Sequence, residues 1–119
     1  MLPRAGRLRK KSDFERAYQQ GRRVTMESAV LYAYAREDEA PTRMGFVVGR
    51  QFGTAVARNR VKRRLRAAAR TLWATLPSGY DLVWVARPAA ATLPLEDLQQ
   101  QMRTALRKAG IATGGGACS

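Results

Sequence analysis

Residues 55–76 read AVARNRVKRRLRAAARTLWATL, and this stretch predicts the longest helix of the chain. At about 100° per residue, five apolar side chains fall within an arc of about 80°, which is wide enough to seat the helix on a sheet. Those side chains are Val61, Leu65, Ala68, Leu72 and Leu76. Thr54 offers an N-cap, and the Pro-Ser-Gly sequence at 77–79 ends the helix.

The rest of this helix carries positive charge that no acidic residue balances. Seven of the residues 58–70 are basic, and residues 40–80 contain no Asp or Glu. Like charges at i and i+4, such as Arg58 and Lys62, each destabilise an isolated helix by roughly 0.2 to 0.5 kcal/mol. A charge run is usually a solvated face, but solvated helices normally mix both signs. We therefore expect the phosphates of a nucleic acid to neutralise this face.

The composition agrees with a single RNA-binding domain over residues 1–119. The chain has 22 Lys and Arg against 9 Asp and Glu, a formal net charge of +13, and 45% hydrophobic residues. Only four of the basic residues are lysine, and this excess of arginine favours forked contacts with phosphates and stacking on bases. A membrane is the competing polyanion, but membrane binding needs an exposed apolar stripe, and the stripe in this chain is required for the core.

The residue types exclude several kinds of chemistry. The chain has no His, which removes Ser-His-Asp and Cys-His nucleophilic sites and most zinc sites. Its single cysteine, Cys118, excludes an internal disulfide, and its acidic residues form no evident cluster for a two-metal nuclease. No apolar run approaches the roughly 18 residues of a membrane span, and no signal peptide is evident, so we expect a cytoplasmic protein.

Two further helices are predicted, one on each side of the charged helix in the chain. Ser12 and Glu15 form a capping box for a helix over 13–20, and Gly21 is expected to end it in the left-handed conformation. An apolar stripe at helical spacing predicts the last helix over 94–109.

Three strands complete the predicted fold. Alternating patterns predict strands over 24–36 and 43–50, which we expect to pair as an antiparallel hairpin, and the apolar run 81–87 predicts a central strand. Residues 1–11 are predicted to be a basic arm that orders only against a partner, and 111–119 a flexible tail. The order helix, strand, strand, helix, strand, helix predicts an α+β fold, a small α/β sandwich.

Aromatic residues suggest a second binding surface. Trp84, Phe46 and Trp73 are expected in the core. A partly exposed cleft between the first helix and the sheet would accept an unpaired strand, because bases stack on aromatic faces at about 1 to 3 kcal/mol each. The residues of this cleft are Phe14, Tyr18, Val30 and Tyr32.

The stretch 53–66, GTAVARNRVKRRLR, closely resembles the signature of the protein subunit of bacterial ribonuclease P, an Arg-Asn-Arg triplet followed by basic residues on one helix. The resemblance extends over about residues 8–108. Its other marks are Arg7-Leu8 before Asp13-Phe14, Gly21, VLY at 30–32, GFVV at 45–48 and Ala86-Arg87 after a strand.

The resemblance implies a fold and a division of labour. The fold would be a ribosomal-protein-like sandwich with a left-handed βαβ crossover, where general rules favour the right-handed one. A large RNA subunit with bound Mg²⁺ would cut precursor tRNA to leave the mature 5′ end. The protein would bind both RNAs without catalytic residues, a metal site of its own or a protein partner.

Carried over residue by residue, the resemblance implies two sets of contacts. The cleft residues Phe14, Tyr18, Val30 and Tyr32 match the family's site for the single-stranded 5′ leader of precursor tRNA. Gln51 stands where the family usually has a second basic residue beside Arg50. The residues implied to contact RNA are Arg50, Arg58, Asn59, Arg60, Lys62, Arg63 and Arg66.

Two other functions are compatible with the same residues. A ribosomal protein could use the basic helix on ribosomal RNA, and it would copurify with ribosomes. An autonomous metal-dependent nuclease would cleave RNA without an RNA subunit, and we expect no such cleavage.

Overall fold

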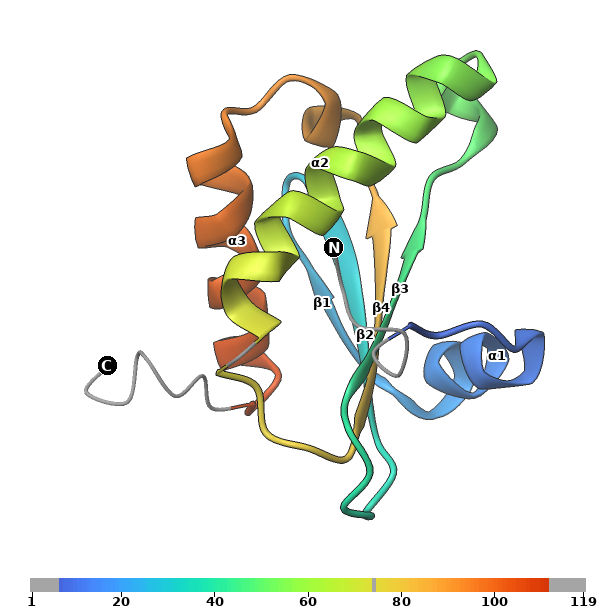
Figure 1. Ribbon diagram of the computed structural model, residues 1–119, viewed down its shortest axis with the longest axis vertical. Helices are drawn as coiled ribbons and strands as arrows, with labels where there is room; N and C mark the ends of the chain where they lie inside the picture. The colour runs from blue at the N-terminus through green and yellow to red at the C-terminus, as the bar shows by residue number, and fades with distance from the viewer. Residues whose placement is uncertain (1–6, 74, 112–119) are drawn as a thin grey trace.

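The computed structural model describes residues 7–73 and 75–111, which form a four-stranded sheet with helices on both faces (Figure 1). This mixed architecture confirms the predicted fold class. The helices are α1 (Lys11–Gln20), α2 (Ala55–Trp73) and α3 (Leu95–Lys108), with 3-10 turns η2 (Arg50–Phe52) and η3 (Pro88–Ala91). The strands are β1 (Arg22–Thr25), β2 (Ala29–Ala35), β3 (Arg43–Val47) and β4 (Tyr80–Ala86).

The sheet has the strand order β1-β2-β4-β3. Strand β2 pairs antiparallel with β1 and β4, whereas β3 pairs parallel with β4, so the predicted hairpin between 24–36 and 43–50 is wrong. Strand β4 lies between β2 and β3, because its side chains are apolar on both faces of the sheet. Leu82, Val83 and Trp84 are all at most 1% exposed, as a central, doubly covered strand requires.

The region 24–36, predicted as one strand, is a hairpin of β1 and β2. The amide of Met26 donates to the carbonyl of Ala29 at 2.8 Å, and the turn is tied to α3 because Ser28 donates twice to Gln101 Oε1. The hairpin places Val24 against the core and Tyr32 on the opposite face, whereas one continuous strand over 24–36 would have put both on the same face.

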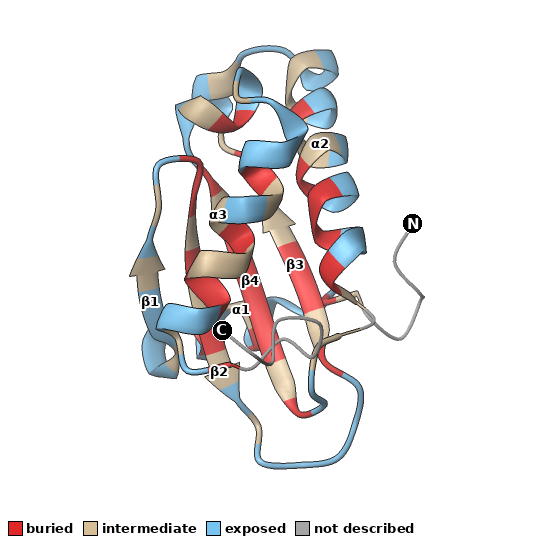
Figure 2. Ribbon diagram, turned by 90° about the vertical axis from the view of Figure 1, so that its left-hand side faces the viewer, coloured by how far each residue is buried: buried red, intermediate tan, exposed pale blue. Residues whose placement is uncertain are grey.

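The sheet separates two layers (Figure 2). Helices α2 and α3 pack together on the face turned to the viewer, over a core that includes Leu31, Leu65 and Leu106, and α1 lies on the other face. Strands β3 and β4 run upward in Figure 1, and β4 lies to the left of β3 in Figure 2. The β3–α2–β4 crossover is therefore left-handed, as the family resemblance implied.

The beginning of the described chain is docked on the sheet. Leu8 is 6% exposed, and its amide donates to the carbonyl of Met44 at 2.9 Å. The prediction that residues 1–11 order only against a partner is therefore wrong for 7–10, because Leu8 has an apolar place to bury, and Lys11 already belongs to α1. Residues 1–6 lie outside the described part of the chain.

At the C-terminal end, the folded part of the chain extends one residue further than predicted. Ile111, assigned to the tail, is 3% exposed and packs in the core, because the turn after α3 directs this apolar side chain inward. Residues 112–119, with Cys118, lie outside the described part of the chain.

Helix ends match the sequence signals only in part. The amide of Ala57 donates to Thr54 Oγ1 at 3.2 Å, which confirms Thr54 as the cap of α2. Helix α1 instead begins before Ser12, so the capping box is wrong. Gly21 is extended, with φ −77°, and a Cβ there would lie 2.3 Å from the carbonyl oxygen of Ala17. Close approach of the backbone, not a left-handed conformation, requires this glycine.

Candidate nucleic-acid interface

Side chains on the α1 face of the sheet form three rows that cross the strands. Strand register defines them, because residues paired across strands point to the same face. The first row is Tyr34, Asp81 and Arg43; the second is Arg23, Tyr32, Val83 and Gly45; the third is Thr25, Val30, Val85 and Val47.

The first row anchors α1 to the sheet. Asp81 is fully buried and accepts hydrogen bonds from Arg36 and from Arg43, whose Nε and Nη2 each lie 2.9 Å from a carboxylate oxygen. The bond to Asp81 raises the pKa of the Arg43 guanidinium above its ordinary value. Arg43 Nη1 also lies 3.3 Å from Oδ2 of Asp13 on α1. One guanidinium therefore links β3, β4 and α1.

Helix α1 places two aromatic rings beside the second row. The ring of Phe14 lies against Gly45, where a Cβ would come within 2.5 Å of it. The centroids of Tyr18 and Tyr32 lie 4.9 Å apart with the ring planes at 83°. Partial burial and the neighbouring Tyr32 raise the pKa of the Tyr18 hydroxyl, although Tyr18 is still 40% exposed.

The third row continues this surface with apolar side chains. Val30, Val47 and Val85 are all half-buried. The structure thus brings the four predicted cleft residues to one face and adds Val47 and Val85, which sequence reasoning missed. Their alternating pattern was visible, but only the strand register places them beside Val30. Aromatic rings over an apolar floor suit the stacking of unpaired bases.

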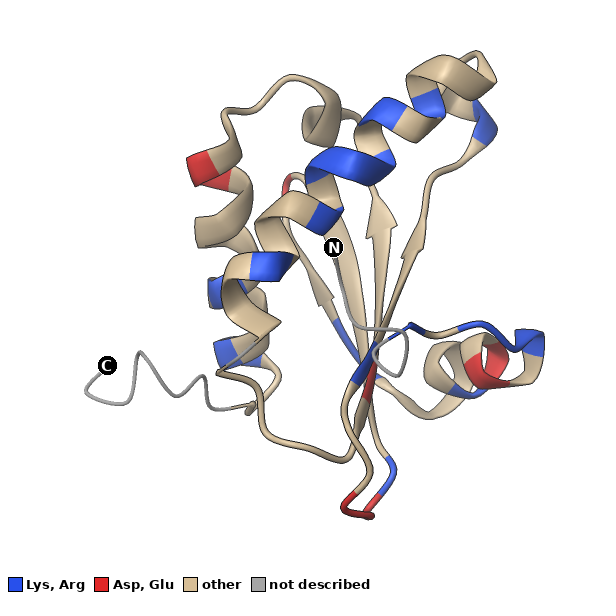
Figure 3. Ribbon diagram, in the orientation of Figure 1, with Lys and Arg blue, Asp and Glu red and all other residues tan. Residues whose placement is uncertain are grey.

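Helix α2 carries its cations on the opposite side of the sheet (Figure 3). Its buried side chains are Val61, Leu65, Ala68, Ala69 and Leu72. In the described part of the chain, no Lys or Arg of α2 lies within 4.0 Å of a carboxylate oxygen. Exposed on this helix are Asn59, Arg60, Arg63, Arg66 and Arg70, while Arg58, Lys62 and Arg64 are half-buried.

Two arginines of α2 also bind the protein itself. Nε of Arg64 donates to the carbonyl of Ala90 at 3.0 Å, and its Nη2 donates to that of Leu93, so Arg64 holds the loop before α3. Arg58 Nε donates to the carbonyl of Val48 at 3.4 Å. Arg50, the remaining predicted contact, is exposed in η2. All the predicted RNA contacts except Arg50 therefore lie on α2, and Arg50 lies in η2, just before that helix.

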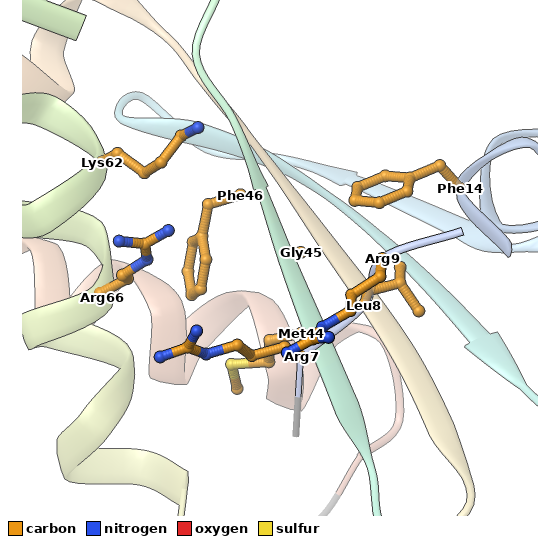
Figure 4. Close-up of a pocket in the computed structure, with 9 residues that line it drawn as sticks. All are labelled: Arg7, Leu8, Arg9, Phe14, Met44, Gly45, Phe46, Lys62 and Arg66. Atoms are coloured by element: carbon orange, nitrogen blue, oxygen red, sulfur yellow. The ribbon is translucent and has the colours of Figure 1, made fainter. Parts of the chain in front are cut away.

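A groove of about 400 Å³ at the edge of β3 connects the two surfaces (Figure 4). Lys62 and Arg66 reach it from α2, and the ring of Phe46 stands beside them. Arg7 and Arg9 enter from the docked N-terminal segment, and Phe14 lines the groove from the cleft. Sequence reasoning assigned both arginines to an arm and missed them as site residues; the signal was an apolar Leu8 between them.

Neither a metal cluster nor a membrane helix is found within residues 7–73 and 75–111. No three His, Cys, Asp or Glu residues gather there as a metal ion would require. None of the helices in these ranges is both long and apolar enough to cross a bilayer.

Comparisons with known proteins agree with this geometry. A family model described as Ribonuclease P matches residues 2–110. The ribonuclease P protein component of Symbiobacterium thermophilum is 41% identical over 110 residues, covering 92% of this chain and 96% of that protein. That of Gluconacetobacter diazotrophicus is 40% identical over 112 residues, covering 93% and 97%.

Solved structures give the same result. The RNase P protein of Staphylococcus aureus superposes with a TM-score of 0.78 at 27% identity, covering 91% of this chain and 98% of that one. The RNase P protein of Thermotoga maritima gives 0.74 at 26% identity, covering 86% and 96%. With this fold, a cationic α2 and a match over nearly its whole length, the chain belongs to the ribonuclease P protein family.

Proposed function

We propose that this chain is the protein subunit of ribonuclease P and promotes endonucleolytic removal of the 5′ leader from precursor tRNA. The observation that carries this proposal is the charge on α2, where the basic residues of the Arg-Asn-Arg signature lack acidic partners within the described chain. Folded RNA supplies the missing negative charge. Arg58, Asn59, Arg60 and Arg63 hold phosphates of ribonuclease P RNA, with Arg50, Lys62 and Arg66 beside them.

The cleft on the other face binds the single-stranded leader. Phe14, Tyr18 and Tyr32 provide ring surfaces for unpaired bases, and Val30 belongs to the apolar floor. Stacking of this kind needs little sequence preference, because every base has a π-face. The groove at β3 lets one protein contact both RNAs, since it joins the cleft to α2.

The protein binds the two RNAs and neutralises their phosphates, while the RNA subunit performs the cleavage. Mg²⁺ ions held by the RNA subunit supply the charge stabilisation of phosphodiester hydrolysis. Lys and Arg side chains reduce the repulsion between two RNAs and so lower the Mg²⁺ concentration that their association needs. The chain acts as one RNA-binding domain in the cytoplasm, where bacterial precursor tRNA is made.

Reconstitution tests this function directly. The protein is mixed with a bacterial ribonuclease P RNA, and cleavage of precursor tRNA is measured at a Mg²⁺ concentration too low for the RNA alone. We expect cleavage at the mature 5′ end only when protein and RNA are both present. Unchanged cleavage on adding folded protein would contradict the proposal, as would cleavage by protein without RNA.

A further inference from the structure

Strand β1 presents two neighbouring arginines to opposite sides of the sheet. Val24 is half-buried against the core on the α3 side of the sheet, so Arg23 and Thr25 point to the α1 face. Arg22 points to the core side, where its Nη1 reaches the carbonyl of Ala109 at 3.4 Å. Both arginines are exposed. In the described part of the chain, Arg23 makes no ion pair or side-chain hydrogen bond.

Arg23 stands directly beside the leader cleft. Its register partner across the β1–β2 pair is Tyr32, and the Tyr32 ring in turn meets the ring of Tyr18. Tyr32 therefore has a cation beside it on β1 and a second aromatic ring against it from α1. Proteins hold single-stranded nucleic acid by combining positive charge along the backbone with aromatic side chains on which bases stack.

We propose that Arg23 is a further binding residue of the cleft and holds a phosphate of the 5′ leader next to the nucleotide that stacks on Tyr32. This inference rests on the proposed function. A guanidinium suits the role because its fork matches two phosphate oxygens.

The apolar floor of the cleft directs the leader backbone toward the edges of the sheet. Val30, Val47 and Val85 form an apolar floor that would desolvate a phosphate without bonding to it. Bases therefore occupy the floor, and the phosphates lie along the solvent-exposed edges. The β3 edge has Arg7 and Arg9 in its groove, and the β1 edge has Arg23.

The pair Arg22 and Arg23 offers a matched experiment. Arg23→Ala and Arg22→Ala remove the same charge from adjacent positions, so a general loss of electrostatic attraction affects both equally. Affinity of the holoenzyme is measured for precursor tRNA with a leader and for mature tRNA. We expect Arg23→Ala to weaken precursor binding about two- to fivefold relative to Arg22→Ala, with equal affinities for mature tRNA. Arg23→Lys should recover part of the loss.

A second measurement locates the phosphate. Leader linkages are replaced one at a time by neutral methylphosphonates, and each is combined with Arg23→Ala in a double-mutant cycle. One linkage should weaken binding to the wild type but cause no further loss with Arg23→Ala. Additive losses at every linkage would overturn the inference.

The Tyr32→Ala variant tests the leader cleft separately from the role of Arg23. If Tyr32→Ala weakens precursor binding while Arg23→Ala behaves like Arg22→Ala, the inference about Arg23 is wrong and the cleft stands. If Tyr32→Ala leaves the preference for precursor over mature tRNA unchanged, the cleft itself is wrong, and Arg23 loses its role with it.

Discussion

Tyr18 on α1 meets Tyr32 on β2 edge to face, with centroids 4.9 Å apart and planes at 83°. In the described part of the chain, this is the one contact between aromatic rings that joins α1 to β2. An edge-to-face arrangement covers only one ring face, so another aromatic group can still stack on the pair. The helix and the sheet thus meet through a contact that stays open to a base.

Replacement of Tyr32 by alanine should remove a stacking surface for the leader. We expect precursor tRNA to bind roughly 5- to 150-fold more weakly, the equivalent of about 1 to 3 kcal/mol, with little change for mature tRNA. Tyr32→Phe keeps the ring and should bind nearly as the wild type does. Equal losses for precursor and mature tRNA would refute the leader cleft.

The Tyr18 hydroxyl should titrate above its ordinary pKa of 10.0, because partial burial and Tyr32 both disfavour the phenolate. Because the pKa is raised in the folded state, the protonated Tyr18 hydroxyl contributes stability below pH 10. That contribution is lost as the pH rises through the raised pKa. Ultraviolet absorbance of tyrosinate, compared with Tyr18→Phe, checks this. Tyr32→Phe should lower the pKa of Tyr18 only in part, because burial remains the main cause of the shift; a pKa unaffected by that change would contradict the contribution assigned to Tyr32.

Arg60 and Arg64 lie one turn apart on α2 but should behave differently. Arg60 is exposed, so Arg60→Ala should weaken binding to ribonuclease P RNA and reduce the log-log salt slope by about 0.7 to 0.9. Arg64→Ala removes bonds to two loop carbonyls and should lower stability by roughly 1 to 2 kcal/mol. Filter binding at several salt concentrations and urea denaturation separate the two effects. The same salt slope for both variants would show the assignment to be wrong.

Asp81 should be the most sensitive charged position of the fold. Asp81→Asn leaves Arg36 and Arg43 without their buried partner, and we expect stability to fall by roughly 3 kcal/mol. Asp38 binds the same Arg36 from an exposed position, so Asp38→Asn is the matched control and should cost much less. Urea denaturation followed by tryptophan fluorescence measures both, and similar losses would contradict the role of burial.

Local signals predicted the elements that carry their own pattern. The apolar stripe and Thr54 placed the start of α2 correctly, although the helix ends at Trp73 and not at Leu76. The continuous apolar run of β4 indicated a central strand. The turn residues Met26, Glu27 and Ser28 include no glycine or proline, and apolar residues lie on both sides of them. Two consecutive polar residues, Glu27 and Ser28, are the one sign of the turn between β1 and β2, and they did not separate the two strands. Strand order is set by contacts distant in the sequence, which is why the predicted hairpin failed.

Some residues of the candidate site could also be predicted from local sequence patterns, whereas others could be placed only from the fold. The cations of α2 are adjacent in the sequence, so their common helix was predictable from charge alone. Phe14 and Tyr32 lie far apart in the sequence, and they were grouped in one cleft from their aromatic character and from resemblance to a family. Val85 and Arg23 can be placed beside the cleft only from the strand register, which no local pattern contains. Arg7 needs the docked N-terminal segment, for which the apolar Leu8 was the local sign.

Successive residues of one strand serve different layers in this sheet. In β3, Met44 and Phe46 face α2, whereas Gly45 and Val47 face α1. Insertion of one residue would exchange the two sets and spoil both surfaces together. We therefore expect changes in length to be accommodated in connections such as 37–41 and not in the interior of β3, where Gly45 also leaves no room for a side chain beside Phe14.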